Sequence, residues 1–290
     1  MRHPLRASGP APAMFRRGAQ ALGLGLALLL GACTTQQGGN NSAMPGTSGG
    51  PRSTDRQVSM NDGRPTGDPR ESAKVHTELA FGYFQRGQMA VALEEVRIAL
   101  NARPDYYMAY NVLGLINMDL GDNLKAEDAF RRALAIAPND SDTLNNYGWF
   151  LCQTKRERLS IPQFMQALKD PLYSTPTKPY LNAGVCSQRI GDDAAAEEYF
   201  RKAFSLDPAN PNALLNLGEF YLKRNDLVKA RFYSDRLNKT YEASPQSLWL
   251  ALRIERKAGD HASESSFASQ LRRRYPNSAE YQRLSQGQFE

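Results

Sequence analysis

Small and large apolar residues recur in register from residue 73 onward, with a period of 34 residues. This period predicts a chain of similar repeats, each made of a helix, a turn and a second helix. The six repeats span residues 73–106, 107–140, 141–176, 177–210, 211–244 and 245–278. We expect residues 279–290, which follow the last repeat, to form a C-terminal cap or tail.

Three columns of the repeat have a clear physical role. Position 8, where the two helices come closest, holds Ala80, Gly114, Gly148, Gly184 and Gly218. Position 15 needs a left-handed backbone and holds Gly87, Gly121, Gly191 and Gly259, with Asn225 as a tolerated substitute. Position 24 holds the larger Val96, Phe130, Phe164 and Phe200. This pattern is that of a tetratricopeptide repeat, so the predicted fold is an all-α superhelix of six helix-turn-helix units.

The third repeat departs from this pattern. It is two residues longer, has Lys155 at the turn position, and carries Ser160 and Pro162 where its second helix should be under way. Serine is a favoured N-cap, and proline is tolerated in the first turn of a helix. We therefore expect the second helix of this repeat to begin late, with Ser160 as its N-cap.

The N-terminal segment is typical of an exported protein. Arg16 and Arg17 precede the apolar residues 21–30, a stretch too short to span a bilayer stably. This stretch runs into the sequence LGAC, a bacterial lipobox pattern that ends at Cys33. We expect residues 1–32 to be a lipoprotein signal peptide and Cys33 to be the lipidated residue.

The segment after the lipobox predicts a tether and a location. Residues 33–72 are rich in Gly, Ser, Thr, Pro, Asn and Gln, and a stretch of this composition cannot offset its ordering entropy by burial. We therefore expect a disordered tether. Residue 34 is Thr, whereas an Asp there would resemble an inner-membrane retention signal. The sequence thus favours lipid anchoring at the periplasmic face of the outer membrane. Translation could start at Met1 or at Met14, and the sequence does not distinguish them.

The net charge does not favour a nucleic-acid partner. The whole chain has a formal charge of +6, but residues 1–32 contain four arginines and no acidic residue. The remainder carries only +2. We therefore expect no binding to nucleic acid.

No catalytic constellation is present in the sequence. The three histidines are His3, His76 and His261, and they lack the spacing of metal ligands. There is no glycine-rich phosphate loop, nucleophile elbow or HExxH helix. We expect no enzymatic activity, no metal and no cofactor.

The first helices of the first two repeats are unusually apolar on the side expected to face a partner. This side of the superhelix is formed by positions 2, 5, 9 and 12 of each first helix. The candidate groove residues are Thr77, Phe81, Phe84, Met108, Asn111, Leu115 and Met118. Flexible Met and flat aromatic side chains suit burial of an apolar segment of a partner protein. The alternative is that the tether or neighbouring helices cover some of these side chains.

Cys152 and Cys186 lie late in the first helices of the third and fourth repeats. Consecutive first helices pack side by side in this architecture, and an exported protein meets an oxidising compartment. A disulfide is therefore chemically allowed, and two buried thiols are the alternative.

The third and fourth repeats also resemble a known family. They contain NNYGWFLC from Asn145 to Cys152, DPLY from Asp170, TP at Thr175, and NAGVC ending at Cys186. Generic repeats do not share these irregular segments. The chain resembles the PilF/PilW family of type IV pilus biogenesis and stability lipoproteins. The resemblance covers these segments, the lipobox, the tether and all six repeats.

The resemblance implies a function and a pairing of cysteines. It implies an outer-membrane lipoprotein that binds the pilus secretin subunit or another pilus assembly protein. Such a protein promotes secretin multimerisation or localisation, and thereby pilus biogenesis and twitching motility. It also implies that Cys152 and Cys186 form a disulfide. The alternative function is an envelope adaptor for peptidoglycan enzymes or proteases, because fold alone does not settle function.

Overall fold

The computed structural model describes residues 68–289. The predicted signal peptide, Cys33 and most of the predicted tether lie outside the described residues. The described residues contain helices and no strand. The helices are α1 (Pro69–Gln85), α2 (Met89–Ala102), α3 (Tyr107–Asp119), α4 (Asn123–Ile136), α5 (Ser141–Gln153), α6 (Glu157–Ala167), α7 (Thr177–Arg189), α8 (Asp193–Leu206), α9 (Pro211–Lys223), α10 (Leu227–Thr240), α11 (Pro245–Ala258), α12 (His261–Arg274) and α13 (Ala279–Ser285).

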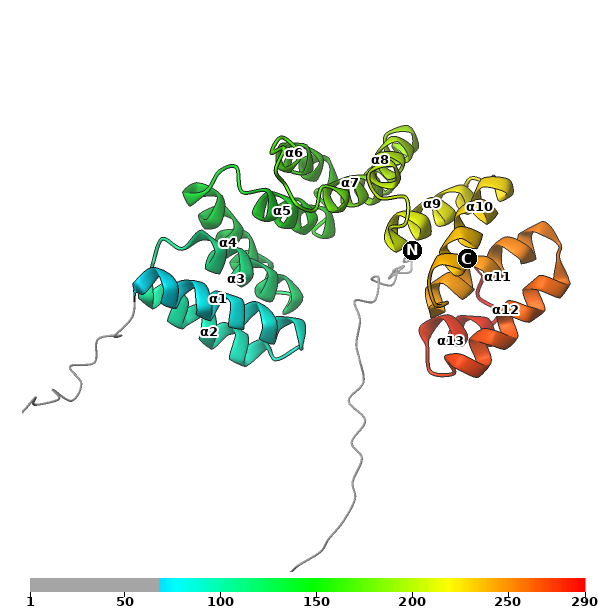
Figure 1. Ribbon diagram of the computed structural model, residues 1–290, viewed down its shortest axis with the longest axis horizontal. Helices are drawn as coiled ribbons and strands as arrows, with labels where there is room; N and C mark the ends of the chain where they lie inside the picture. The colour runs from blue at the N-terminus through cyan, green and yellow to red at the C-terminus, as the bar shows by residue number, and fades with distance from the viewer. Residues whose placement is uncertain (1–67, 290) are drawn as a thin grey trace, which may run out of the picture. The chain divides into compact units, whose positions relative to one another are not determined.

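The first twelve helices form six hairpins that follow one another in chain order (Figure 1). Each odd-numbered helix packs against the next helix to form a hairpin, and each hairpin packs against the following one. The last helix, α13, packs against α11 and α12. The predicted all-α tetratricopeptide-repeat fold is confirmed, with one hairpin for each repeat.

The residue at position 8 of the repeat is small because a phenylalanine side chain fills the space beside it. Phe130 lies against Gly114, and Phe164 lies against Gly148. Both rings are fully buried. The fifth repeat has Ser234 at the plug position, and Leu250 of the following repeat fills the space beside its small residue instead. In the second, third and fifth hairpins, one large side chain therefore fills the space beside the small residue, and in the fifth a neighbouring repeat supplies it.

The turn of the third repeat is regular although its sequence is not. Lys155 adopts φ 63°, as does Asn225 in the fifth repeat, so both residues take the left-handed conformation that glycine adopts elsewhere. Because the turn is kept, α6 begins directly after it at Glu157. The expected late start of this helix at Ser160 is wrong.

Ser160 and Pro162 lie inside α6 and not at its start. Ser160 is fully buried, and its hydroxyl donates a hydrogen bond to the carbonyl of Glu157 at 2.6 Å. The two extra residues of this repeat lie after α6, which ends at Ala167 and is three residues shorter than α4. The following segment contains Pro171 and Pro176, which oppose helix.

The N-terminal boundary of the helical array also differs from the expectation. The tether was expected to reach residue 72, but α1 begins at Pro69. Asp68 caps this helix, because its side chain accepts a hydrogen bond from the backbone N–H of Arg70 at 2.9 Å. A capping aspartate followed by proline at the first helical position is a strong helix start.

Candidate functional site

The structure separates the seven predicted groove residues into exposed and packed ones. Phe81 of α1 is 40% exposed, and Met108 of α3 is 44% exposed. Thr77 is buried, and its hydroxyl donates to the carbonyl of Ala73 at 2.7 Å. The assignment of Thr77 to a binding surface is therefore corrected, because its side chain is turned onto its own helix.

The other four candidates are partly covered by neighbouring helices. Phe84 packs against the core between the first two hairpins, and Leu115 and Met118 pack against the cluster that contains Phe130 and Phe150. Asn111 accepts a hydrogen bond from the Nδ2 of Asn146 at 3.0 Å. Phe81 and Met108 are thus the two apolar groove candidates that stay exposed.

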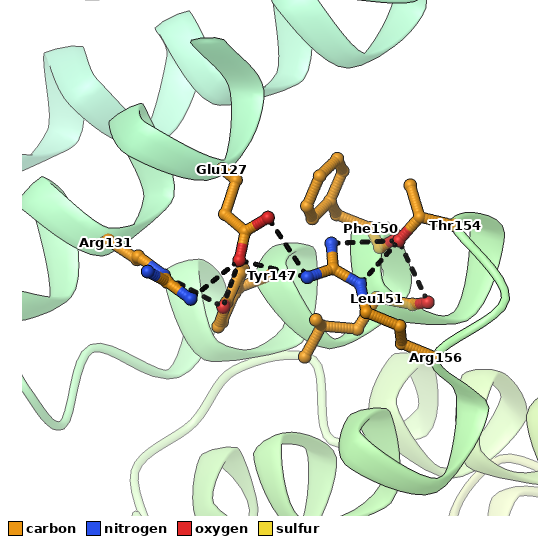
Figure 2. Close-up of polar contacts among 7 residues, drawn as sticks. All are labelled: Glu127, Arg131, Tyr147, Phe150, Leu151, Thr154 and Arg156. Atoms are coloured by element: carbon orange, nitrogen blue, oxygen red, sulfur yellow. Dashed lines mark hydrogen bonds and ion pairs between the residues drawn. The ribbon is translucent and has the colours of Figure 1, made fainter. Parts of the chain in front are cut away.

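A polar network that no sequence motif predicted joins the second hairpin to the third. Figure 2 shows Glu127 of α4 between Arg131 and Arg156. Nη1 of Arg156 donates to both carboxylate oxygens of Glu127 at 3.0 Å, and Arg131 approaches the same carboxylate at 2.8 Å. Chiefly through the Arg156 hydrogen bond, these contacts hold the pKa of Glu127 below its ordinary value.

Arg156 is itself fixed in place by α5. Its Nε and Nη2 each donate to the hydroxyl of Thr154 at 3.1 Å, and its guanidinium lies 5.2 Å from the ring centre of Phe150. The hydroxyl of Thr154 in turn donates to the carbonyl of Phe150 at 2.9 Å (Figure 2). The turn of the third repeat is therefore bonded to the hairpin before it. This arrangement is structural, since every polar group in it already has a partner.

The structure joins Cys152 of α5 and Cys186 of α7 in a disulfide. Their Cα atoms lie 5.9 Å apart, and both residues are fully buried. Phe164 and Ala183 belong to the same buried cluster. Nη1 of Arg189 donates to the carbonyl of Cys152 at 3.2 Å, so a polar contact accompanies the covalent one. This disulfide connects the third and fourth hairpins.

A hollow of the described surface lies in the C-terminal half, where no candidate was predicted. A cavity of about 890 Å³ is lined by residues of α7, α9 and α11, together with Phe289. Its lining is rich in arginine and lysine.

Within residues 68–289, every helix is too short or too polar to span a bilayer.

Comparison with known proteins gives the family. Two profiles described as tetratricopeptide repeat match residues 78–141 and 191–253. The chain is 31% identical over 212 residues to the type IV pilus assembly protein PilF of Pseudomonas aeruginosa, covering 73% of this chain and 84% of PilF. It is also 31% identical to PilW, described as a widely conserved type IV pilus biogenesis factor. The chain belongs to the PilF/PilW family.

The solved structures of this family agree with the fold. The PilW crystal structure aligns with a TM-score of 0.68 over 73% of this chain and 97% of PilW. The structure of P. aeruginosa PilF aligns with a TM-score of 0.66 at 29% identity, over 76% of this chain and all of PilF. The helical array of this PilF/PilW-family chain thus matches nearly the whole length of both solved relatives.

Proposed function

We propose that this protein is a lipoprotein of the outer membrane that binds a pilus component and promotes type IV pilus biogenesis. In this proposal it is anchored by lipid on Cys33 and faces the periplasm. It acts by binding and not by catalysis, and it favours multimerisation of the secretin. The observation that carries the proposal is the match to PilF over 84% of that protein, which is named for type IV pilus assembly.

The proposed contact surface is the exposed apolar part of the first two hairpins. Phe81 of α1 and Met108 of α3 each expose two-fifths or more of their surface. Burial of such side chains by a partner would contribute about 1 to 2 kcal/mol each, at roughly 25 cal/mol per Å² of apolar surface. A lipid anchor would add to this by raising the local concentration of the protein at the membrane.

The experiment is a secretin multimer assay on membranes from a strain that lacks the gene. The strain is complemented with the wild type, with Cys33→Ala, or with Phe81→Glu combined with Met108→Glu. We expect heat-stable multimers at the outer membrane with the wild type only. A charge at either apolar position opposes its burial, and loss of the lipid removes the anchor.

A matched control separates the proposed surface from general effects of surface charge. Leu124 and Val228 are 85% and 81% exposed and lie on α4 and α10, so Leu124→Glu with Val228→Glu adds the same charges elsewhere. This variant should support normal multimers. Normal multimers with the Phe81 and Met108 variant would contradict the proposed surface. Normal multimers without the gene would contradict the proposed function and favour the envelope-adaptor alternative.

A further inference from the structure

The cavity of the C-terminal half lies on the same face of the repeat as the predicted groove. Val185 of α7, Glu219 of α9 and Arg253 of α11 line it, and each occupies position 9 of its repeat. Phe81 occupies position 9 in the first repeat. The fold therefore presents equivalent positions in both halves of the array, but the side chains differ in character.

The C-terminal cavity is strongly cationic. Five basic side chains line it, namely Arg189, Lys223, Arg253, Arg256 and Lys257. The one acidic side chain in the lining is Glu219, which is already paired with Arg253 at 2.8 Å. Like charges on one concave surface repel each other and attract an anionic ligand.

Three of these cations have no carboxylate partner among the residues that the structure describes. Arg189 donates to the carbonyl of Cys152 and to Oε1 of Gln153, both at 3.2 Å. Lys257 donates to the carbonyl of Leu222 at 3.4 Å, and Lys223 forms no ion pair with the described residues. Within residues 68–289, therefore, no carboxylate compensates the positive charges of these three side chains.

On this face, Phe289 of the chain itself is held by aromatic and arginine side chains. The ring of Phe289 stacks on Trp249, with ring centres 5.7 Å apart, and lies 3.7 Å from the guanidinium carbon of Arg256. Nε of Arg253 donates to the backbone carbonyl of Phe289 at 3.0 Å. Arginine thus binds a peptide carbonyl here, and an aromatic ring is held between Trp and Arg.

We propose that the cavity between α7, α9 and α11 binds an extended acidic segment of a partner protein. Carboxylates of this segment pair with Arg189, Lys223 and Lys257, and an apolar side chain packs against Val185 and Phe289, the partly exposed apolar residues of the lining. The alternation of cationic and apolar lining fits a peptide with both kinds of side chain better than the uniform charge of a nucleic-acid backbone. The proposal does not depend on a role in pilus assembly.

The test is peptide binding to the purified full-length chain. The probe is a fluorescein-labelled heptapeptide in which glutamate alternates with leucine and phenylalanine, followed by fluorescence anisotropy. The chain contains two tryptophans, and both adjoin the cavity lining: Trp149 lies 5.6 Å from the guanidinium of Arg189, and Trp249 contacts Phe289. Intrinsic tryptophan fluorescence therefore gives a second readout without a label.

We expect saturable binding that weakens as salt is added, because the contacts are between exposed charges. Lys223→Glu combined with Lys257→Glu should weaken it by about tenfold or more. Both side chains are exposed, so the variant keeps the fold, which circular dichroism verifies. Lys74→Glu combined with Lys239→Glu is the matched control, since these exposed lysines on α1 and α10 do not line the cavity. It should bind as the wild type does.

Several outcomes would overturn the proposal. One is the absence of saturable binding of the acidic peptide to the wild type, and another is unchanged affinity in the Lys223 and Lys257 variant. A peptide with lysine in place of every glutamate must not compete, and equal competition would remove the electrostatic basis. Equal competition by a single-stranded oligonucleotide of the same charge would show a general polyanion surface and not a peptide site.

Discussion

Gly114 and Gly148 are required by the space available and not by the backbone conformation. A Cβ on Gly114 would lie 2.6 Å from the ring of Phe130, and one on Gly148 would lie 2.7 Å from the ring of Phe164. Both rings are fully buried, so they cannot move away without disturbing the core. At Gly114 and Gly148 the position-8 column of the sequence thus records a contact between the two helices of one hairpin.

We predict that Gly114→Ala lowers the free energy of unfolding by about 1 to 3 kcal/mol, as overpacking of a tight core does. Gly82 provides the control, because a Cβ there would have no atom within 4 Å. Gly82→Ala should raise stability by up to about 1 kcal/mol through helix propensity. Urea unfolding followed by circular dichroism measures both. Equal effects of the two substitutions would rule out the steric explanation.

The exposure of individual groove side chains could not be predicted from the sequence. The repeat position of Thr77 predicted a side chain on the binding face, but its hydroxyl bonds back to the helix and its surface is buried. Phe84 and Met118 are covered by residues of neighbouring hairpins. Repeat position fixes the direction of a side chain from its helix, whereas its exposure depends on contacts that a single-repeat pattern does not contain.

At the scale of the helix, the turn at Lys155 determines where α6 begins, and the N-cap preference of Ser160 does not. The second helix begins at position 17 of every repeat, at Glu157 in the third as at Asn123 in the second. Lys155 adopts the left-handed conformation despite its Cβ, which costs about 1 kcal/mol or more. The helix count and most boundaries followed from the 34-residue period. The start of α6 could not be predicted in this way. Ser160 looks like an N-cap in the sequence, whereas Lys155 does not look like a residue that adopts the left-handed turn conformation.

The contact of α4 with the turn before α6 predicts a pH-dependent contribution to stability. Glu127 has a lowered pKa in the folded protein, chiefly because it accepts hydrogen bonds from Arg156. A lowered pKa stabilises the fold above the pKa of the unfolded state, about 4.3, and this stabilisation is lost as the pH falls through the lower folded value.

We therefore expect Glu127→Gln to reduce the free energy of unfolding by about 1 to 2 kcal/mol at neutral pH. The difference from the wild type should shrink as the pH falls below about 4.3 and vanish in stronger acid. Glu94, which pairs with Arg97 on the surface of a single helix, is the control, and Glu94→Gln should have a much smaller effect. Urea unfolding across this pH range is the measurement. A difference that does not change with pH would contradict the role assigned to the carboxylate charge.

At the scale of the whole array, helices contact only their own hairpin and the adjacent ones within the described residues. Stability in such an arrangement is close to a sum of repeat and interface terms. The Cys152–Cys186 disulfide adds a covalent term in the middle, across a sequence separation of 34 residues. Closing a loop of this length is worth about 4 kcal/mol on chain-entropy grounds.

We predict that Cys152 and Cys186 are oxidised in protein isolated from the native cell. Non-reducing peptide mapping should recover their peptides as one linked species, and alkylation before reduction should label neither thiol. Replacing both residues with alanine should lower the free energy of unfolding by about 2 to 4 kcal/mol. Full alkylation of both thiols in protein from the oxidising compartment would contradict the prediction.

The same covalent connection has a mechanical consequence. An array of hairpins held at its two ends transmits a pulling force from each hairpin to the next, and the weakest junction yields first. The residues between Cys152 and Cys186 are excluded from this extension, because the force passes through the sulfur atoms and bypasses the chain between them. About 110 to 120 Å of potential length, at 3.3 to 3.6 Å per extended residue, is therefore withheld while the bond is intact. Under load, the centre of the array would act as a fixed link between two extensible arms.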